Sequence, residues 1–321
     1  MERHHQFAAI ASNALGRSDM TRKLLVCGGT GLIGRALTQH VTRDGVQIVL
    51  LVRRPPRRHS DPNLVEIEWH PDRPLPVADL APLEGCYAAV HLAGANVAGH
   101  RWTPTYKRLI LNSRVDTSRA LGRIFTALTA PPPVLVAASA IGYYGNRGNE
   151  VLTEASRPGN GFLPEVCRAW EAATAGLAPR VVQLRFGVVL TARGGALPHL
   201  LPFFRLGLGG RLGNGHQWMS WVSLEDAVAT IEFAIAQPEL SGAFNTTAPH
   251  PVTNAEFTRT LGLILHRPTL LRVPSLVLRA ALGEMAQEAL LASARAIPER
   301  LLAAGFLFSH ERLEQTVTEM V

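Results

Sequence analysis

One glycine-rich segment limits the folds open to this chain more than any other part of its sequence. The segment is Gly28-Gly29-Thr30-Gly31-Leu32-Ile33-Gly34. A short apolar run at residues 23–27 precedes it, and apolar residues follow it at helical spacing as far as Val41. In this order of strand, glycine turn and helix, Gly28 permits the tight turn and Gly34 lets the helix pack closely against the sheet.

The same segment predicts an anion site. Gly31 leaves room for backbone N–H groups to close on a pyrophosphate, and the positive end of the helix dipole faces the same place. A glycine-rich turn that binds nothing is the alternative interpretation. We expect the segment to seat the pyrophosphate of a dinucleotide, with contacts from Gly28, Thr30, Gly31, Leu32, Ile33 and Gly34.

Further apolar runs alternate with helical patterns along the chain, which is typical of a parallel sheet covered by helices. Pro131-Pro132-Pro133 ends the helix expected from Pro104, because three consecutive prolines cannot continue it. Strands are expected at residues 23–27, 47–52, 65–69, 88–93, 134–138, 181–184 and 243–246. The predicted fold class is α/β, a doubly wound Rossmann-type parallel sheet with a smaller α-rich C-terminal capping lobe.

Three parts of the chain differ in their residue composition and in the periodicity of their apolar residues. Residues 1–20 have mixed polarity and no clear period, so we expect a disordered leader there. Residues 21–245 form the expected dinucleotide-binding domain, in which glycine-rich segments from about residue 187 lie over a cleft. Residues 246–321 form the lobe, with a capping box at residues 253–256 and a tail expected to be helical from about residue 273 to Pro298.

Composition excludes several classes of protein. With 47% apolar residues, the 321-residue chain can bury a large core, yet no stretch approaches the roughly 18 apolar residues of a membrane-spanning helix. We therefore expect a cytoplasmic protein with no membrane partner, and a homodimer is left open. Cys27, Cys86 and Cys167 lack the spacing of a metal site or a disulfide framework and are expected to be buried free thiols.

The formal net charge of +7 raises the question of a nucleic-acid partner. The densest basic cluster is Arg53-Arg54-Pro55-Pro56-Arg57-Arg58, directly after the second expected strand, with no acidic residue beside Arg53 or Arg54. At that place a carboxylate would bind the ribose 2′-hydroxyl of NAD, whereas arginine pairs with the 2′-phosphate of NADP. A merely solvated basic loop is the alternative. The position of Arg53 and Arg54 predicts NADP as the cofactor and no nucleic-acid partner.

Small residues end the fourth expected strand, in His91-Leu92-Ala93-Gly94. Ligands of parallel α/β sheets gather beyond the carboxyl ends of the strands. Leu92, Ala93 and Gly94 would let a cofactor lie against the backbone and join the expected cofactor-binding residues, although a crowded strand end would look the same.

Longer motifs give the chain a family resemblance. GGTGLIG, VHLAGAN, SAIGYYG, RFGVVL and PFFRLGLGGRLGNGHQWMSWV resemble the epimerase-family proteins among the atypical extended short-chain dehydrogenase/reductases. The tail, LRVPSLVLRAALGEM through AIPERLLAAGFLF, is similar to that group's C-terminal domain. The resemblance covers about residues 23–317. It implies a Rossmann core, NADP binding and a small substrate-capping lobe, and it fixes no reaction.

The resemblance also implies a catalytic pattern that this chain lacks in part. The wider superfamily uses a Ser or Thr after strand five and a Tyr four residues before a Lys, which together exchange a proton with the substrate oxygen. The serine is present as Ser139. The Tyr-Lys pair is absent, because Lys23 and Lys107 are the only lysines and neither follows a tyrosine at that spacing.

Glu171 resembles the glutamate that commonly follows the superfamily motif. Aligning on it puts Leu163 at the tyrosine position and Cys167 at the lysine position, and neither side chain supports that proton chemistry. The remaining candidates near Ser139 are Tyr143, Tyr144 and Arg147.

Tyr144 stands before Gly145, like a pocket-lining tyrosine of the family. We weigh it as an acid or base and, as the favoured interpretation, as a pocket-wall aromatic with a hydrogen-bonded hydroxyl. Ser139, Tyr143 and Tyr144 are the catalytic candidates, and Ser139 is also counted among the cofactor contacts. Arg114 falls where the superfamily often has an asparagine, so it could reach the cofactor's phosphates or ribose, or form a surface ion pair instead.

Other chemistries find little support. His100, His199, His216 and His250 stand singly in expected loops, so no metal site is predicted. No GxSxG motif appears, which disfavours an α/β-hydrolase. Trp218, Trp221 and His216 either face the cleft or pack in the core.

Two hypotheses of function remain. The first is an NADP-dependent oxidoreductase or epimerase-like enzyme with a non-standard proton donor, whose unknown substrate is a carbonyl compound or a sugar nucleotide. The second is an NADP-binding regulatory or interaction protein without turnover. The retained Ser139 and the glycine-rich cleft place the enzyme slightly ahead.

Overall fold

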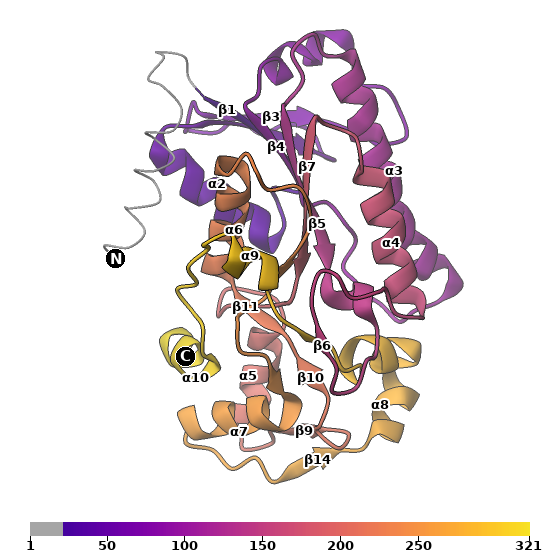
Figure 1. The fold of residues 1–321 in the computed structure, drawn as a ribbon, viewed down its shortest axis with the longest axis vertical. Helices are drawn as coiled ribbons and strands as arrows, with labels where there is room; N and C mark the ends of the chain where they lie inside the picture. Colours follow the sequence, from indigo (N-terminus) through magenta and orange to yellow (C-terminus); the bar gives the residue numbers. More distant parts are fainter. Residues whose placement is uncertain (1–21) are drawn as a thin grey trace.

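A seven-stranded parallel sheet forms one half of the molecule (Figure 1). The computed structural model describes residues 22–321, so the leader expected at residues 1–20 lies outside the described part. The strand order is β12-β7-β5-β4-β1-β2-β3. The bounds are β1 Lys23–Cys27, β2 Gln47–Val52, β3 Leu64–Glu68, β4 Ala88–His91, β5 Val134–Ala140, β7 Arg180–Phe186 and β12 Gly242–Thr246. All seven expected strands are confirmed, and the fold is the predicted Rossmann-type α/β fold.

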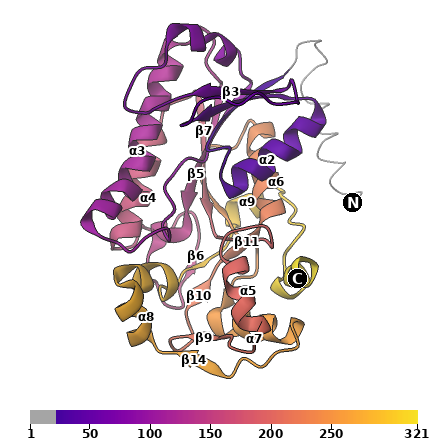
Figure 2. The ribbon, with the colours of Figure 1, turned by 180° about the vertical axis from the view of Figure 1, so that it is seen from behind.

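Two helical layers cover the sheet, one on each face (Figures 1 and 2). Successive side chains of a strand point to opposite faces, so β1 supplies both cores. Leu24 packs in the cluster that contains Leu37 and Ile231, whereas the adjacent Leu25 packs in the cluster that contains Leu121. The covering helices are α2 Leu32–Val41 and α6 Leu224–Ala236 on one face, and α3 Pro104–Ala127 and α4 Phe162–Thr174 on the other.

A second layer of short elements forms the lobe below the carboxyl ends of the strands (Figure 1). Short strand pairs join segments that are distant in the sequence: β8 with β11, β9 with β14, β10 with β13, and β6, which precedes β7, with β15. The capping box expected at residues 253–256 is confirmed, because Thr253 and Glu256 exchange the two capping bonds at the start of α7. The elements of the lobe are β6 Val151–Leu152, β8 Val188–Leu190, α5 Leu197–Arg205, β9 Gly210–Leu212, β10 Trp218–Met219, β11 Trp221–Ser223, β13 Val252–Thr253, α7 Asn254–Ile264, β14 Leu271–Val273, α8 Ser275–Leu282, β15 Arg295–Ala296 and α10 Leu313–Met320. In contrast, α9 Glu299–Ala303 lies beside β12, and its Leu301 packs in the core of the sheet.

The continuous helix expected from about residue 273 to Pro298 is wrong. α8 ends at Leu282 because Gly283 takes a left-handed conformation, with φ of +65°. One π-helical turn follows, and Arg295 then pairs with Val151 of β6. The apolar residues of this segment predict one helix from the sequence. In the structure they belong to a helix, a π-helical turn and a strand.

The remaining expectations about composition concern thiols and membrane spans. Cys27, Cys86 and Cys167 are all buried free thiols, as predicted. Within residues 22–321, no helix combines the length and the hydrophobicity needed to cross a bilayer.

Candidate functional site

The glycine-rich segment forms a tight cradle at the carboxyl end of β1. Gly28 has φ of +90°, and a Cβ atom there would lie 2.6 Å from the backbone nitrogen of Ala93. A Cβ at Gly34 would lie 2.3 Å from the carbonyl oxygen of Gly28. Both positions therefore require glycine, and the structure brings Leu92 and Ala93 directly against the turn.

Gly31 differs from its neighbours because its Cβ position is almost open. Its only neighbour within 4 Å would be the Gly28 carbonyl oxygen, at 3.4 Å. Gly31 is the N-cap residue of α2 and has no side chain to fill the first turn of that helix. The helix N-terminus thus presents unpaired backbone N–H groups beside an open space, which suits an anion.

The arginine loop after β2 is fixed by a carboxylate on the next strand. Glu66 of β3 accepts two hydrogen bonds of 2.7 Å from the Arg54 guanidinium and one of 2.9 Å from the Arg57 backbone N–H. His59 lies 3.0 Å from the same carboxylate. No acidic residue is next to these arginines in the sequence, but Glu66 is next to them in the fold. The strand register places Glu66 opposite Leu50, near the end of β2.

The Glu66 carboxylate is fully engaged by these contacts. Only 2% of its side chain is exposed. Burial raises its pKa, but the hydrogen bonds from Arg54, Arg57 and His59 outweigh burial and lower the pKa to about 2. Glu66 is therefore ionised and occupied by this loop, and it is not free to bind a ribose hydroxyl.

Arg53 has a different environment from Arg54. It is exposed, and it forms no ion pair within residues 22–321. Its charge is close enough to Cys27 at the end of β1 to oppose the rise in that thiol's pKa that burial causes. Arg53 is thus an unpaired cation at the edge of the glycine cradle, while Arg54 holds the loop in shape.

Arg114 of α3 borders the cradle on the side of β4. A Cβ atom at Gly94 would lie 3.1 Å from the guanidinium carbon of Arg114, so the small residue makes room for this cation. Arg114 donates to the carbonyl of Ile110 at 2.9 Å, and its guanidinium carbon lies 4.9 Å from the centre of the Trp170 ring. No carboxylate pairs with it in the described chain, and burial lowers its pKa. The surface ion pair considered from the sequence is absent there.

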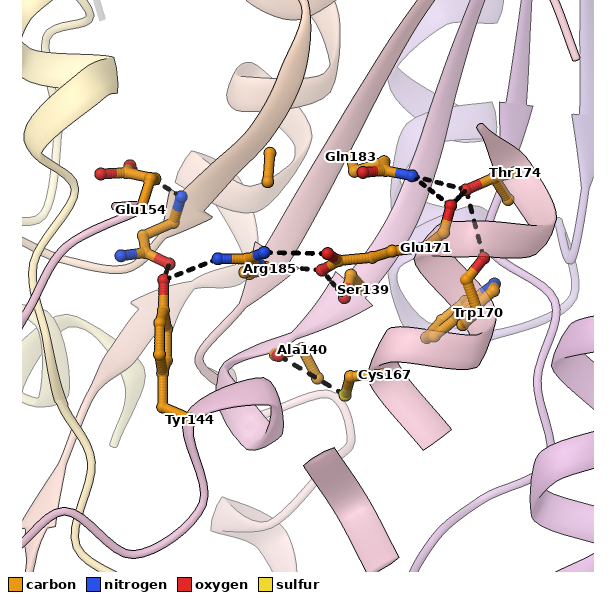
Figure 3. A network of polar contacts seen from close by, with 12 residues as sticks. Ser139, Ala140, Tyr144, Glu154, Cys167, Trp170, Glu171, Thr174, Gln183 and Arg185 are labelled. Carbon is orange, nitrogen blue, oxygen red and sulfur yellow. Dashed lines mark hydrogen bonds and ion pairs between the residues drawn. The ribbon is translucent and has the colours of Figure 1, made fainter. Parts of the chain in front are cut away.

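Ser139 belongs to a buried polar network at the carboxyl end of β5 (Figure 3). Its hydroxyl donates to Glu171 of α4 at 2.7 Å. The same carboxylate accepts two hydrogen bonds of 2.8 Å from Arg185 of β7, and Arg185 also donates to the Tyr144 hydroxyl at 3.0 Å. The network links β5, α4 and β7, and Arg185 lies between Glu171 and Tyr144 (Figure 3).

Tyr144 lies inside this network and is fully buried. Besides Arg185, its hydroxyl lies 2.7 Å from Asn245 Oδ1 and 3.0 Å from the Thr153 carbonyl. Burial raises the pKa of Tyr144 to about 12, although Arg185 opposes the rise. These contacts match the interpretation of an aromatic with a satisfied hydroxyl and disfavour an acid or base.

Tyr143 lies next to Tyr144 but is only half-buried. The Arg185 guanidinium carbon is 3.5 Å from the centre of its ring. Within residues 22–321 its hydroxyl makes no hydrogen bond. Among the three catalytic candidates, Tyr143 has the hydroxyl without a hydrogen-bond partner in the described part of the chain.

The positions expected for a Tyr-Lys pair face the turn after β5. A Cβ at Gly142 would lie 3.4 Å from Leu163 Cβ and 3.7 Å from the Cys167 sulfur. Burial raises the pKa of Cys167 to about 12, so the thiol stays protonated. Leu163 and Cys167 thus both lie beside the turn after β5, and neither side chain can replace a Tyr-Lys pair.

Sequence reasoning missed several residues of this region. Arg185 lies in the RFGVVL motif, which carried the resemblance but received no role. Arg193 is exposed and precedes Gly194, whose Cβ position lies 2.8 Å from Leu32 at the start of α2. Glu66 could have been found only from the pairing of β2 with β3.

The remaining sequence candidates lie elsewhere. His100, His199, His216 and His250 are exposed. Trp221 is fully buried in the core, whereas Trp218 is half-buried and donates to Asn149 at 2.7 Å.

One group in the described chain could gather metal ligands: the ligand atoms of His40, Asp44 and Glu232 lie within 4.8 Å of one another. His40 Nε2 lies 3.3 Å from a Glu232 oxygen, and this contact raises the pKa of His40. A proton on the imidazole competes with a metal ion, so an ion pair accounts for the group.

Comparison with known protein families gives one match for the sheet domain and another for the C-terminal segment. Residues 24–246 match the NAD dependent epimerase/dehydratase family, and residues 273–320 match a domain of unknown function, DUF1731. Epimerase family protein Mb2239 of Mycobacterium bovis is 43% identical over 295 residues, covering 91% of this chain and 95% of that protein.

Two solved structures are similar throughout the chain. Human epimerase family protein SDR39U1, crystallised with NADPH, superposes with a TM-score of 0.82 at 35% identity, covering 93% of this chain and 98% of the human one. A nucleoside-diphosphate sugar epimerase from Corynebacterium glutamicum has a TM-score of 0.76 at 31% identity, covering 98% of this chain and 61% of that chain.

Proposed function

Because this chain belongs to the NAD dependent epimerase/dehydratase family, we propose that it binds NADP(H) in the cradle at the carboxyl end of β1. The structure of the human relative with NADPH supports this choice of cofactor. The residues present suit the ligand, since Gly28 and Gly34 close the backbone turn and Gly31 leaves space beside the N-terminus of α2.

The observation that carries the proposal is the contrast between Arg53 and Glu66. NAD recognition uses a free carboxylate near the ribose 2′-hydroxyl. Here the nearby carboxylate, Glu66, is 2% exposed and bound to Arg54, whereas Arg53 is exposed and unpaired in the described chain. Arg53 therefore pairs with the 2′-phosphate, and Arg54 acts mainly by shaping the loop.

Other residues complete the cofactor site. Thr30, Leu32 and Ile33 supply backbone around the pyrophosphate, and Leu92, Ala93 and Gly94 form the wall from β4. Arg114 supplies a second cation on the far side of the cradle, next to Gly94. We take residues 21–245 as the cofactor-binding domain and residues 246–321 as the lobe that completes the substrate side.

The proposed reaction is an NADP(H)-dependent oxidoreduction or an epimerase-like reaction of a carbonyl compound or sugar nucleotide. The nicotinamide, when bound, accepts or donates a hydride. The Ser139 hydroxyl donates a hydrogen bond to Glu171, so its lone pairs remain to accept a hydrogen bond from a substrate hydroxyl. Tyr143 lies in the turn directly after β5, and its hydroxyl has no hydrogen-bond partner in the described part of the chain. It is therefore the preferred proton donor. The name of the Corynebacterium glutamicum structure supports a sugar nucleotide as one substrate class.

A second candidate function is NADP(H) binding without turnover. It is favoured by Leu163 and Cys167 at the Tyr-Lys positions and by the burial of Tyr144. Such a protein would change its contacts with partners according to the cofactor's redox state.

A turnover screen separates the two functions. The protein would be incubated with NADPH or NADP⁺ and libraries of carbonyl compounds and sugar nucleotides. NADPH oxidation would be followed by absorbance, and NMR of the products would reveal epimerisation, which consumes no net cofactor. Turnover that Tyr143→Phe lowers supports the enzyme. Tight NADPH binding without turnover of any compound supports the binding protein.

A further inference from the structure

The far end of the lobe exposes an unusual number of large apolar side chains. Phe203, Leu206 and Leu208 at the end of α5 are 58%, 73% and 54% exposed. Leu270, beside β14, is 91% exposed, and Leu276 of α8 is 77% exposed. Exposed apolar groups gathered in one region commonly mark an interaction site.

Exposed arginines stand among these apolar residues. They are Arg205, Arg211, Arg267, Arg272 and Arg279, and none forms an ion pair within residues 22–321. The sequence contains no Asp or Glu at all in residues 191–224 and 257–283, the two segments that build this end of the lobe. We call the surface formed by these five arginines with Phe203, Leu206, Leu208, Leu270, Leu271, Leu276 and Val277 the arginine-leucine face.

The two segments lie side by side at this end of the lobe. β9 pairs with β14, joining Gly210 to Leu271. Arg267 donates to the Arg205 carbonyl at 2.8 Å, which fixes the loop after α7 beside the end of α5. Both ribbon views place α7, β9, β14 and α8 together at the end of the molecule opposite β3 (Figures 1 and 2).

α8 adds an independent sign that something covers this surface. None of its eight residues is buried, although Leu276, Val277 and Leu278 follow Ser275 in its first turn. Isolated helices of this length are marginal in water, and helices in proteins are stabilised mainly by packing an apolar face. Only Leu282, at the end of α8, packs against a buried apolar cluster, so the exposed Leu276 and Val277 lack a packing partner in the described part of the chain.

We infer that the arginine-leucine face docks on the surface of an anionic lipid bilayer. Apolar tips beside arginines are the pattern of interfacial membrane contacts, in which the apolar groups enter the acyl boundary and the guanidinium groups meet lipid phosphates. The absence of carboxylates disfavours a second copy of the chain, since two such faces would bring arginines together. The apolar residues of this face are aliphatic except for Phe203, whereas the cores of protein interfaces are enriched in aromatic residues. This inference goes beyond the proposed NADP(H) chemistry, and it differs from the expectation of no membrane partner, which rested on the lack of a membrane-spanning segment.

Vesicle co-sedimentation of the full chain tests the inference. We expect binding to phosphatidylcholine vesicles that contain phosphatidylglycerol, weaker binding as salt rises, and no binding to phosphatidylcholine alone. The double variant Arg205→Gln with Arg279→Gln should bind on the order of thirtyfold more weakly, because each arginine near an anionic surface contributes about fivefold in affinity. Arg119→Gln with Arg168→Gln, two exposed arginines on α3 and α4, is the matched control and should bind like wild type.

The apolar part is tested separately. Leu276→Ser with Val277→Ser on α8 should also lose vesicle binding, whereas Leu302→Ser with Leu307→Ser, at exposed leucines elsewhere, should not. NADPH affinity should be unchanged in every variant, which shows that each one is folded. Failure to bind anionic vesicles would overturn the inference. So would a concentration-dependent dimer, seen by light scattering, that the α8 variant abolishes, because the face would then join two copies.

Discussion

The guanidinium of Arg54 and the carboxylate of Glu66 form two parallel hydrogen bonds, each 2.7 Å long, across the ends of β2 and β3. Bidentate pairs of this kind are among the stronger and more directional polar contacts in proteins. The pair holds the basic loop in place and engages the carboxylate that the strand register places near the end of β2. Arg53, one residue earlier, is exposed and forms no ion pair within residues 22–321.

Two glycine substitutions should separate ligand binding from folding. Gly31→Val should abolish binding of NADPH and NADH, because the valine side chain would fill the space proposed for the pyrophosphate. The protein should stay folded, because that space beside the Gly28 carbonyl is open. Gly34→Val should prevent folding, because its Cβ would lie 2.3 Å from that carbonyl oxygen. Calorimetric titration and circular dichroism measure the two effects. A Gly31→Val variant that still binds NADPH would show that the phosphates lie elsewhere.

The two adjacent tyrosines should have different roles. Tyr143→Phe should lower any turnover at least about tenfold with little effect on stability, because its free hydroxyl is the proposed proton donor. Tyr144→Phe should lower the free energy of unfolding by about 1–3 kcal/mol, since Arg185 and Asn245 would lose a buried partner. Kinetic assays and urea unfolding of both variants check this. The reverse pattern would assign the chemistry to Tyr144.

The Glu171–Arg185 pair should behave as a coupled unit. Arg185→Met should cost about 3–5 kcal/mol, because it leaves the Glu171 carboxylate without its main partner. Adding Glu171→Gln should restore part of that loss, since the unpaired charge is then gone. Urea unfolding of both single variants and the double variant gives the coupling energy. Strictly additive losses would mean that the pair contributes no interaction of its own.

His310 should make stability depend on pH above neutrality. The Asp226 carboxylate, 3.6 Å from Nδ1, raises the pKa of His310 to about 9 despite burial. Its stabilising effect is therefore complete below pH 6.5, the ordinary value, and disappears as the pH rises through about 9. His310→Asn should be less stable than wild type at pH 6 and differ little above pH 9. A stability difference that does not change between these pH values would contradict the shift.

The sequence predicted the sheet well because each strand is a local apolar run between a turn and a helix. It also located the cradle, since the steric needs of Gly28 and Gly34 follow from their place in one turn. The Arg54–Glu66 and Glu171–Arg185 pairs were out of reach, because they depend on which strands and helices become neighbours. The segment after Leu282 was misread because its strand pairs with Val151, a partner far away in the chain.

Calorimetric titration of the purified protein with NADPH and with NADH tests the central claim most directly. We predict that NADPH binds at least about tenfold more tightly, because Arg53 adds charge-assisted hydrogen bonds to the 2′-phosphate. Arg53→Ser should weaken NADPH binding by about 2 kcal/mol and leave NADH nearly unchanged, while Arg43→Ser, an exposed arginine after α2, should alter neither. Equal affinities of the wild-type protein for the two cofactors would contradict the account.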